Sequence, residues 1–482
     1  MFAESPVPFA EQKKYMSEGY WKYWNADEQK RIDADIEKYR KADAAVDGLP
    51  ANAEVKVEQI SHDFIFGAHI FNFDQLGSHE RNEIYKAQFG EIWNSATIAF
   101  YWKTLEPVEG MPRFAPRCED TENYWNLCDN PNAQPHWRRP ATDPVVKFCE
   151  EKGIRAHGHV LAWGNRMWQI PEWLMDKLQE EVGPLDDIIT SYGRDEQPDY
   201  FPGMSAEEIE KRLPRYTRIV NEAFVKRIID IALRYRGRLQ SWDVANESAT
   251  DFEQGNFANN HGLMKSHYGI LPGDMTYKAF KVAEAFFPRE VKLNINDYNL
   301  NPPYKKQVED LLARGCKIDI MGAQMHLFNP QQCADIAAGT TDLQSPKAVR
   351  DWIDYVQIPG LPIHLSEITI TSPGSDVKGE SIQSVIAYNL YRLWFSQEQM
   401  MGITWWNTVD GCGAPKEPAV SGIFHRDMTP KLAYFTLRDL ITKEWRTSLT
   451  VKTDASGKIS FRGFKGKYRV TWNGGEKEVY VK

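Results

Sequence analysis

The sequence is poor in cysteine for its length and has no long apolar run. Its 482 residues include six cysteines, and none of them has the CxxC spacing that is typical of zinc sites. Six cysteines in so long a chain do not make a disulfide framework, although Cys118 and Cys128 could pair in an oxidising compartment. No stretch is long and apolar enough to span a membrane. We therefore expect neither a metal site nor a membrane segment.

The sequence also lacks an excess of positive charge. The net charge is -9 and the isoelectric point is about 5.8, which argues against a nucleic-acid partner, because phosphates need a basic surface. The first residues, MFAESPVPF, lack the basic and apolar segments of a signal peptide. If a signal peptide was removed, we expect a secreted, periplasmic or cell-surface protein; otherwise the location stays open, as does the oligomeric state.

Aromatic residues are abundant. They make up 12% of the chain and include 16 tryptophans and 21 tyrosines. Such a content is compatible with a large core. It is equally compatible with sugar binding, because the C–H faces of a pyranose stack on aromatic rings. Composition alone leaves both interpretations open.

Segments with strand and helix character alternate along the chain, as expected for parallel βα units. Eight strand candidates favour a closed (β/α)8 TIM barrel over a doubly wound sheet, and no glycine-rich phosphate loop follows the first strand. We therefore predict an α/β fold with barrel architecture. The strands predicted most clearly are 55–66, 154–163, 239–245, 291–295, 318–323, 362–366 and 402–406. The helices predicted most clearly are 143–152, 224–235, 276–287, 304–313, 381–397 and one that opens at Pro346.

The two ends of the chain differ from this pattern. Residues 1–59 are predicted as an arm of helix and strand, with a helix over 26–44. Residues 60–442 form the barrel, and residues 443–482, with short alternating runs between glycines, form a small β appendage. Two long loops, about 110–142 and about 183–204, are expected to shape the active face. Caps are predicted at Asn25, with Glu28, and at Ser205, with Glu208.

Polar residues follow the predicted strands at the ends where a barrel carries its active site. Two of them, Glu247 and Glu367, are carboxyl groups at the ends of the fourth and seventh strands. Glycoside cleavage needs one carboxyl group to protonate the leaving oxygen and another near the anomeric carbon. A retaining enzyme holds the pair ~5–5.5 Å apart. The other strand-end residues are His157, His159, Trp163, Asp243, Asn246, Asn296, Asp297, Tyr298, Gln324, His326, Trp405, Trp406 and Asp410.

Several of these segments resemble motifs of glycoside hydrolase family 10, the xylanase family. The segment Trp242–Glu247, WDVANE, resembles the motif of the acid/base residue, and Leu365–Ile368, LSEI, resembles that of the nucleophile. The resemblance runs in order from about residue 60 to 442. The other matching segments are Asn296–Asn299 (NDYN), Gly322–Leu327 (GAQMHL), Ile403–Trp406 (ITWW) and Pro430–Tyr434 (PKLAY).

The resemblance implies a role for each matching residue. Glu247 would be the acid/base and Glu367 the nucleophile. Asn246 would hydrogen-bond the sugar 2-hydroxyl, and His326, beside Gln324, would orient Glu367. The remaining substrate-binding residues would be Lys103 and His159 at the glycone hydroxyls, Trp163 and Trp406 as the walls of the glycone subsite, and Tyr298 near the leaving sugar.

The sequence departs from the family pattern around the second glycone sugar. Ala99 and Phe100 stand where the family has Glu-Asn, so Phe100 is expected to block this subsite or to stack on a sugar ring. Arg166 is expected to add a charge that could pair with a uronic acid. The alternative is that Phe100 only packs against the barrel rim and that Arg166 faces solvent. Thr369 replaces an aspartate two residues after the nucleophile. Two further departures are Gly164, at a histidine position, and Ala414, at a tryptophan position.

We therefore predict a retaining glycoside hydrolase that cleaves β-1,4-xylosidic linkages in decorated xylan and needs no cofactor. Its expected partner is a polysaccharide or oligosaccharide substrate. One alternative keeps this chemistry on another β-glycan or β-glycoside. A second is a carbohydrate-binding protein with an inactive site, which is less compatible with an intact set of Glu247, Glu367, Asn246 and His326. The exact sugar, endo or exo action and the chain-length preference stay open.

Overall fold

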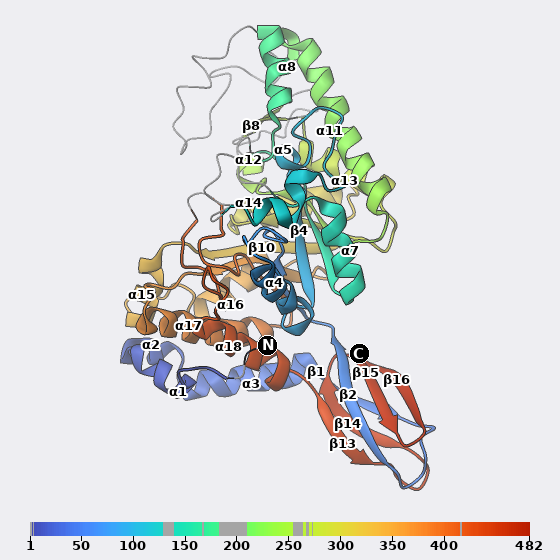
Figure 1. Cartoon of the computed structure of the whole chain (residues 1–482), viewed down its shortest axis with the longest axis vertical. Coiled ribbons are helices and arrows are strands. Elements are labelled where there is room, and N and C mark those ends of the chain that lie inside the picture. The colour runs from blue at the N-terminus through green and yellow to red at the C-terminus, as the bar shows by residue number, and fades with distance from the viewer. Residues whose placement is uncertain are drawn as a thin grey trace.

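The computed structural model describes residues 2, 4–128, 139–165, 168–182, 210–253, 264–266, 269–271, 273–414 and 417–482. Its centre is a closed barrel of eight parallel strands, which confirms the predicted (β/α)8 fold (Figure 1). Around the barrel the strands are β3 (Ile65–His69), β4 (Ser95–Ala99), β5 (Arg155–Trp163), β6 (Ser241–Asn246), β9 (Lys292–Asp297), β10 (Ile320–Leu327), β11 (Ile363–Ile370) and β12 (Met400–Trp405).

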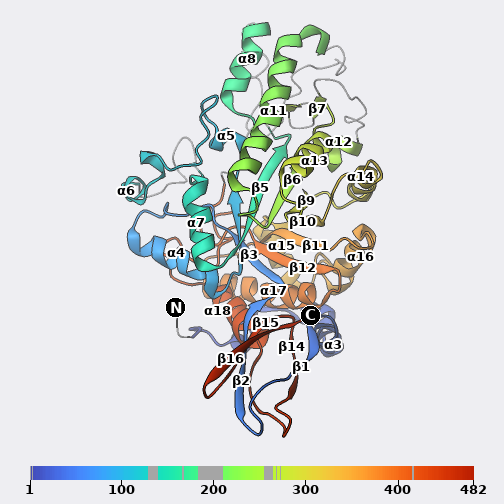
Figure 2. The ribbon, with the colours of Figure 1, turned by 90° about the vertical axis from the view of Figure 1, so that its right-hand side faces the viewer.

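Helices follow the strands and surround the barrel (Figure 2). The main ones are α4 (His79–Glu91), α7 (Thr142–Lys152), α11 (Pro214–Tyr235), α13 (Met275–Phe286), α14 (Pro302–Ala313), α16 (Pro346–Val356), α17 (Val377–Ser396) and α18 (Leu432–Asp439). Further helices lie in the connections and at the N-terminus: α1 (Phe9–Gln12), α2 (Glu18–Tyr23), α5 (Trp102–Leu105), α6 (Glu122–Trp125), α8 (Glu172–Val182), α12 (Ala249–Glu253) and α15 (Pro330–Ala338). A two-stranded ribbon joins β7 (Met264–Ser266) to β8 (Gly269–Leu271).

Local signals explain several helix ends. Gly153 ends α7 in the left-handed conformation with φ 65°, and Pro346 occupies the first turn of α16. Asn25 caps α3 (Ala26–Arg40) through hydrogen bonds from the backbone N–H groups of residues 27 and 28, as predicted. The predicted end of this helix is wrong, however, because the chain from Lys41 pairs with a distant strand instead of continuing the helix.

The strands of the arm and of the appendage, predicted as separate units, form one β unit that projects from the barrel, whereas the helices of the arm pack against the barrel helices (Figures 1 and 2). The predicted strand 55–66 is two strands: β2 (Glu54–His62) belongs to this unit, and β3 starts the barrel. In one sheet of the unit β2 lies between β13 (Ser448–Lys452) and β15 (Gly466–Trp472), and β15 also pairs with β16 (Gly475–Val481). In the other sheet β1 (Lys41–Val46) pairs with β14 (Ile459–Phe464). The unit has its own apolar core, which includes Val57, Phe461, Tyr468 and Val470.

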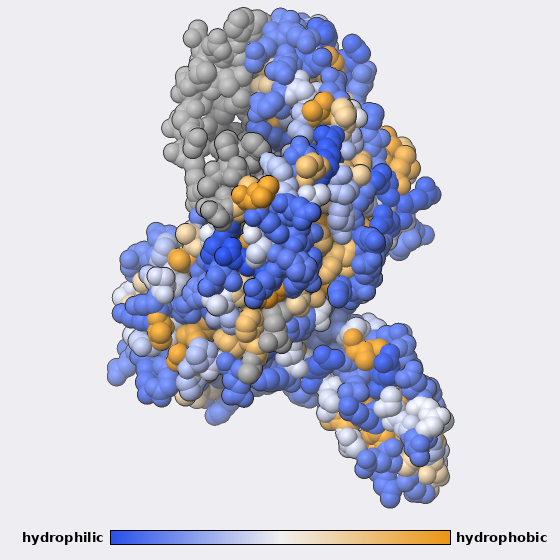
Figure 3. Space-filling model, in the orientation of Figure 1, coloured by the Kyte–Doolittle hydropathy of each residue, from blue (hydrophilic) through white to orange (hydrophobic). Residues whose placement is uncertain are grey.

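The surface carries its apolar residues in small separate groups on the face shown in Figure 3, which is otherwise mainly hydrophilic. Across the described residues, no helix has the length and apolar character needed to cross a membrane. Cys118 and Cys128 are both free thiols, so the suggested pair is not formed. The predicted loop 183–204 and the cap at Ser205 and Glu208 lie outside the described residues.

Candidate active site

A cleft of about 550 Å³ opens at the carboxyl ends of the barrel strands. The pairing of several strands shifts register there: between His159 and Ala162 on β5, between Asp243 and Ala245 on β6, and at Ala323/Gln324 on β10. Such irregularities redirect side chains at strand ends. The residues that line the cleft are Tyr101, Arg139, His159, Trp163, Asn165, Trp168, Asn246, Glu247, Tyr298, Gln324, His326, Phe328, Glu367, Trp406, Ala414 and Glu417.

Glu247 directly follows β6 and has a left-handed backbone with φ 53°, which is unfavourable for a side chain of this kind. Its backbone N–H donates to the Asn296 carbonyl at 2.8 Å, which holds this conformation. The two carboxyl oxygens accept hydrogen bonds from Trp163 Nε1 at 3.0 Å and Gln324 Nε2 at 3.2 Å. The backbone and both neighbours therefore direct the Glu247 carboxyl group into the cleft.

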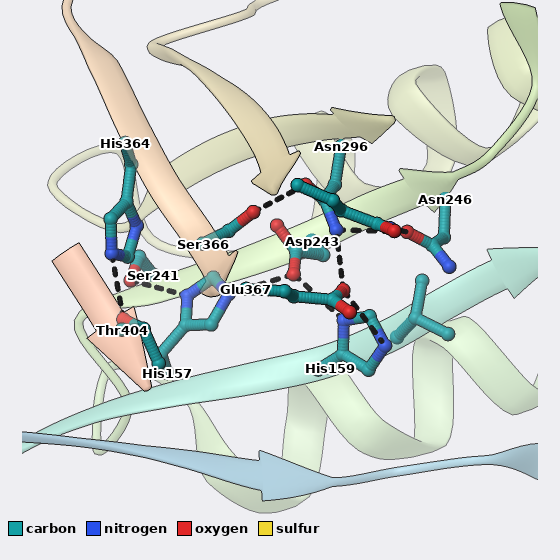
Figure 4. Close-up of polar contacts among 12 residues, drawn as sticks. His157, His159, Ser241, Asp243, Asn246, Asn296, His364, Ser366, Glu367 and Thr404 are labelled. Carbon is teal, nitrogen blue, oxygen red and sulfur yellow. Dashed lines mark hydrogen bonds and ion pairs between the residues drawn. The ribbon is translucent and has the colours of Figure 1, made fainter. Parts of the chain in front are cut away.

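Glu367 lies on β11 and is only 4% exposed. Asn296 Nδ2 donates to Glu367 Oε1 at 2.8 Å and to Asn246 Oδ1 at 2.9 Å, so one amide connects the nucleophile candidate to the residue before Glu247 (Figure 4). Ser366 in turn donates to Asn296 Oδ1 and fixes the orientation of this amide. His326 Nε2 lies 3.4 Å from Glu367 Oε2.

Both carboxyl groups have a raised pKa. Burial raises the pKa of Glu247 to about 7, and the negative charge of Glu367 contributes to this rise. Burial also raises the pKa of Glu367, although His159 and the hydrogen bond from Asn296 act against it. Two buried carboxyl groups that repel each other keep one proton between them near neutral pH. The pair can therefore provide one acid and one ionised nucleophile at the same time.

Buried histidines and an aspartate lie next to the nucleophile candidate (Figure 4). Asp243 Oδ2 contacts His157 Nε2 at 2.9 Å and His159 Nδ1 at 2.8 Å, while His159 Nε2 lies 3.9 Å from Glu367 Oε1. Burial favours a high pKa for Asp243, but the charges and hydrogen bonds of His157 and His159 lower it overall. An ionised Asp243 then orients His159 toward Glu367.

The structure brings nine of the ten predicted site residues together. The cleft contains Glu247, Glu367, His159, Trp163, Asn246, Tyr298, Gln324, His326 and Trp406. Lys103 is the exception, because its ammonium group forms an ion pair with Glu172 of α8 and does not line the cleft. The short helix α5 carries Lys103 toward α8 and away from the carboxyl pair.

The expectation that Phe100 blocks or lines the glycone subsite is wrong. Phe100 is fully buried, and its ring packs at 5.3 Å from Tyr235 and 4.6 Å from Trp242, behind the barrel wall. Ala99 is also buried, in an apolar cluster with Tyr101. Arg166 lies outside the described residues.

Sequence reasoning missed several residues of the cleft. Arg139 comes from a long loop, and its guanidinium lies over the rings of Phe71 at 4.3 Å and Tyr101 at 5.2 Å. Glu417 accepts hydrogen bonds from Trp406 Nε1 at 3.3 Å and from the Ala414 backbone N–H at 2.8 Å. Tyr101 could have been found from the sequence, because it lies next to Ala99 and Phe100. Arg139 and Glu417 lie in irregular loops, and no sequence signal points to them. The other missed residues are Asn165, Trp168 and Phe328.

No cluster of three or more histidine, cysteine or acidic side chains suited to a metal ion occurs among the residues that the structure describes. The functional groups of the cleft are the paired carboxyl groups, the amides that hydrogen-bond them, the nearby imidazoles and the surrounding rings. This set can protonate a leaving oxygen, attack a carbon and stack on a sugar.

A barrel with two carboxyl groups among aromatic walls at its strand ends is the arrangement that glycoside hydrolases use. The chain belongs to glycosyl hydrolase family 10, whose family model matches residues 57–440. Curated relatives include a putative endo-1,4-beta-xylanase of Caldicellulosiruptor saccharolyticus, which is 29% identical over 51% of this chain and 67% of that protein. Another is endo-1,4-beta-xylanase A of Thermotoga neapolitana, 27% identical over 64% of this chain and 25% of that protein. The chain thus covers only about a quarter of the second relative.

Solved structures share the fold at low sequence identity. Xylanase B from Clostridium stercorarium F9 has a TM-score of 0.52 and 20% identity, over 78% of this chain and 97% of that one. Native xylanase 10B from Thermotoga maritima has a TM-score of 0.51 and 18% identity, over 79% of this chain and 96% of that one. At this identity the likenesses show the shared fold alone.

Proposed function

We propose that this protein hydrolyses β-1,4-xylosidic bonds in decorated xylan with retention of configuration. The observation that carries the proposal is the pair of carboxyl groups, the partly buried Glu247 and the buried Glu367, which share a network of amides in one cleft. The names of the family relatives support xylan as the glycan.

The mechanism follows from the two carboxyl groups. Glu367 attacks the anomeric carbon while Glu247 protonates the glycosidic oxygen, so the C–O bond breaks and the aglycone leaves. Glu247 then takes a proton from water, which attacks the anomeric carbon and releases Glu367. Two inversions give net retention and return the proton to Glu247. A carboxyl separation of ~5–5.5 Å is the geometric requirement, and it stays a prediction for this chain.

The substrate-binding residues would act on either side of the broken bond. Trp163 and Trp406, both mostly buried, would form the walls of the glycone subsite, and Asn246 would hold the 2-hydroxyl. Tyr298 is 47% exposed at the cleft and would face the leaving sugar. His159 would reach the glycone hydroxyls from β5.

The preference for a decorated xylan rests on Arg139. It brings a buried guanidinium group to the cleft, and burial lowers its pKa to about 10, which still leaves it charged at neutral pH. Guanidinium groups bind carboxylates through paired, charge-assisted hydrogen bonds. A uronic acid substituent on the xylan chain is the decoration with the matching charge.

A digest of a glycan panel tests this function. The panel contains linear xylo-oligosaccharides, xylan with uronic acid substituents, arabinose-substituted xylan and a β-1,4-glucan, with Glu367→Ala as the control. We expect fastest cleavage of the acidic xylan and a product that is first released as the β-anomer. Faster cleavage of the glucan would overturn the xylan assignment, and an initial α-anomer would overturn retention.

A further inference from the structure

His326 stands between the nucleophile candidate and a buried hydroxyl group. Its Nε2 lies 3.4 Å from Glu367 Oε2, and its Nδ1 lies 2.9 Å from Thr369 Oγ1. Thr369 has no exposed surface, and the His326 ring lies flat against Phe328, with 4.4 Å between ring centres and 8° between ring planes. The imidazole is therefore held by a hydrogen bond at Nδ1 and by a ring on one face, while Nε2 faces the Glu367 carboxyl group.

The chemistry of the two partners differs. An ionised Glu367 can only accept a hydrogen bond, so Nε2 must carry a proton to bind it. A threonine hydroxyl can either donate or accept, so Nδ1 needs no proton. A neutral imidazole with its proton on Nε2 thus satisfies both neighbours, since Thr369 then donates to Nδ1. A carboxylate in place of Thr369 would require protons on both ring nitrogens, and hence an imidazolium ion.

We infer that Thr369 is a positioning residue that keeps His326 a neutral imidazole with Nε2–H directed at Glu367. The inference rests on the proposed function for its catalytic consequence. Glu367 is then stabilised by a neutral donor rather than by a full positive charge. It remains more basic, which strengthens it as a nucleophile, and it takes up its proton at a higher pH.

The surroundings favour the neutral ring. Burial lowers the pKa of His326 to about 4, and the charge of Glu417 acts only weakly against this. The same pocket excludes water from the Thr369 hydroxyl, so the hydroxyl and Nδ1 form their contact away from solvent. The charged and titratable groups that face His326 and Glu367 are His159 on β5, Asp243 and Glu247 on and after β6, and Glu417 in the loop after β12.

Three variants of Thr369 test the inference through the pH dependence of kcat/KM. Thr369→Asp introduces the carboxylate that requires an imidazolium ion next to Glu367. A positive charge at this distance lowers a carboxyl pKa by about 1–3 units, so the acid limb should move down by at least about one unit. Thr369→Val removes the hydrogen bond at nearly constant volume and should lower kcat between about twofold and tenfold with little change in KM. Thr369→Ser keeps a hydroxyl and should retain wild-type behaviour in both measurements.

A second measurement reports the protonation of the His326 ring directly and does not require enzyme activity. In the ¹⁵N-histidine-labelled wild-type enzyme at pH 7, assigned against His326→Gln, we expect Nε2 protonated and Nδ1 bare. Thr369→Asp should show both nitrogens protonated. An imidazolium ion in the wild type, or an unmoved acid limb in a folded Thr369→Asp variant, would overturn the inference. A wild-type chain that cuts no xylan but shows the expected tautomer would instead contradict the proposed function alone.

Discussion

One side of the cleft is built from hydrogen-bonded polar groups and the other from aromatic rings that pack edge to face or at a tilt. On the first side β6, β9, β10 and β11 contribute Asn246, Asn296, Gln324 and Glu367, which contact one another directly. On the second side the ring centres of Phe71 and Trp406 lie 5.2 Å apart, and the guanidinium group of Arg139 lies over the Phe71 ring. A hydrogen-bond network tolerates little change, because each lost partner leaves a buried group unsatisfied. Aromatic rings accept sugars of different shape. The polar side should therefore set the reaction and the ring side the choice of glycan.

The largest effect should follow from removing the nucleophile on the polar side. Glu367→Ala should lower kcat by about 10⁴-fold or more, since no covalent intermediate can form. The measurement is the release of reducing sugar from xylan and of phenol from an aryl xyloside. Azide added to this variant should restore cleavage with the inverted, α-linked azide as product. A β-linked azide would show that the roles of the two carboxyl groups are exchanged.

Removing the acid should have an effect that depends on the leaving group. Glu247→Ala should cut xylan about 10²–10⁴-fold more slowly, because the glycosidic oxygen then leaves without a proton. The first step on aryl glycosides with good leaving groups should be nearly unchanged, and stopped-flow measurement of the burst isolates this step. An equal loss of burst rate for good and poor leaving groups would count against Glu247 as the acid.

The pH profile should reflect the raised pKa of Glu247. The pKa values of the coupled pair are about 7 for Glu247 and about 8 for Glu367, so the pair loses the proton that serves as the acid as the pH rises through this range. kcat/KM for xylan should fall about tenfold for each further pH unit. In Glu247→Gln, assayed on an activated aryl xyloside, the alkaline limb should be absent. Its persistence in a stable, folded variant would assign that limb to another group.

A smaller effect is expected for the amide that links the two carboxyl groups. Asn296→Ala removes the donor to Glu367 and to Asn246, and should lower kcat by at least about tenfold, since a hydrogen bond to a charged group is worth ~1.5–3 kcal/mol. Asn296→Asp, which keeps the shape but replaces the donor by an acceptor, is the matched control. Its kcat should be no higher than that of Asn296→Ala. Wild-type kcat in either variant would show that the polar side is less coupled than its contacts suggest.

The smallest effect should be confined to the ring side. Arg139→Gln should slow cleavage of uronic acid-substituted xylan by about tenfold, as expected for one charge-assisted contact, and leave linear xylo-oligosaccharides unchanged. Arg139→Lys keeps the charge but not the paired geometry, so its rate on uronic acid-substituted xylan should lie between those of the wild type and Arg139→Gln. Equal losses on acidic and neutral substrates would show that Arg139 supports the Tyr101 and Phe71 rings rather than the substrate.

The polar side could be predicted largely from the sequence, and the ring side could not. Asn246 ends β6, Glu247 follows it directly and Glu367 lies in the second half of β11, and side chains at this end of a barrel strand point into the site. Phe100 illustrates the limit. It follows β4 just as directly, yet its ring turns outward and packs between the barrel and α11. Strand position alone does not decide whether the first residue beyond a strand faces the cleft or the helices.

The sequence by itself determined the barrel, the strand ends and the two carboxyl groups, because alternating periodicity and short motifs depend on neighbours in the chain. Only the tertiary structure decided that Lys103 pairs with Glu172, that Arg139 and Glu417 reach the cleft from loops, and that β2 joins the C-terminal strands. Each of these depends on contacts between segments far apart in the chain. Their free energy comes from burial and pairing that no local pattern records.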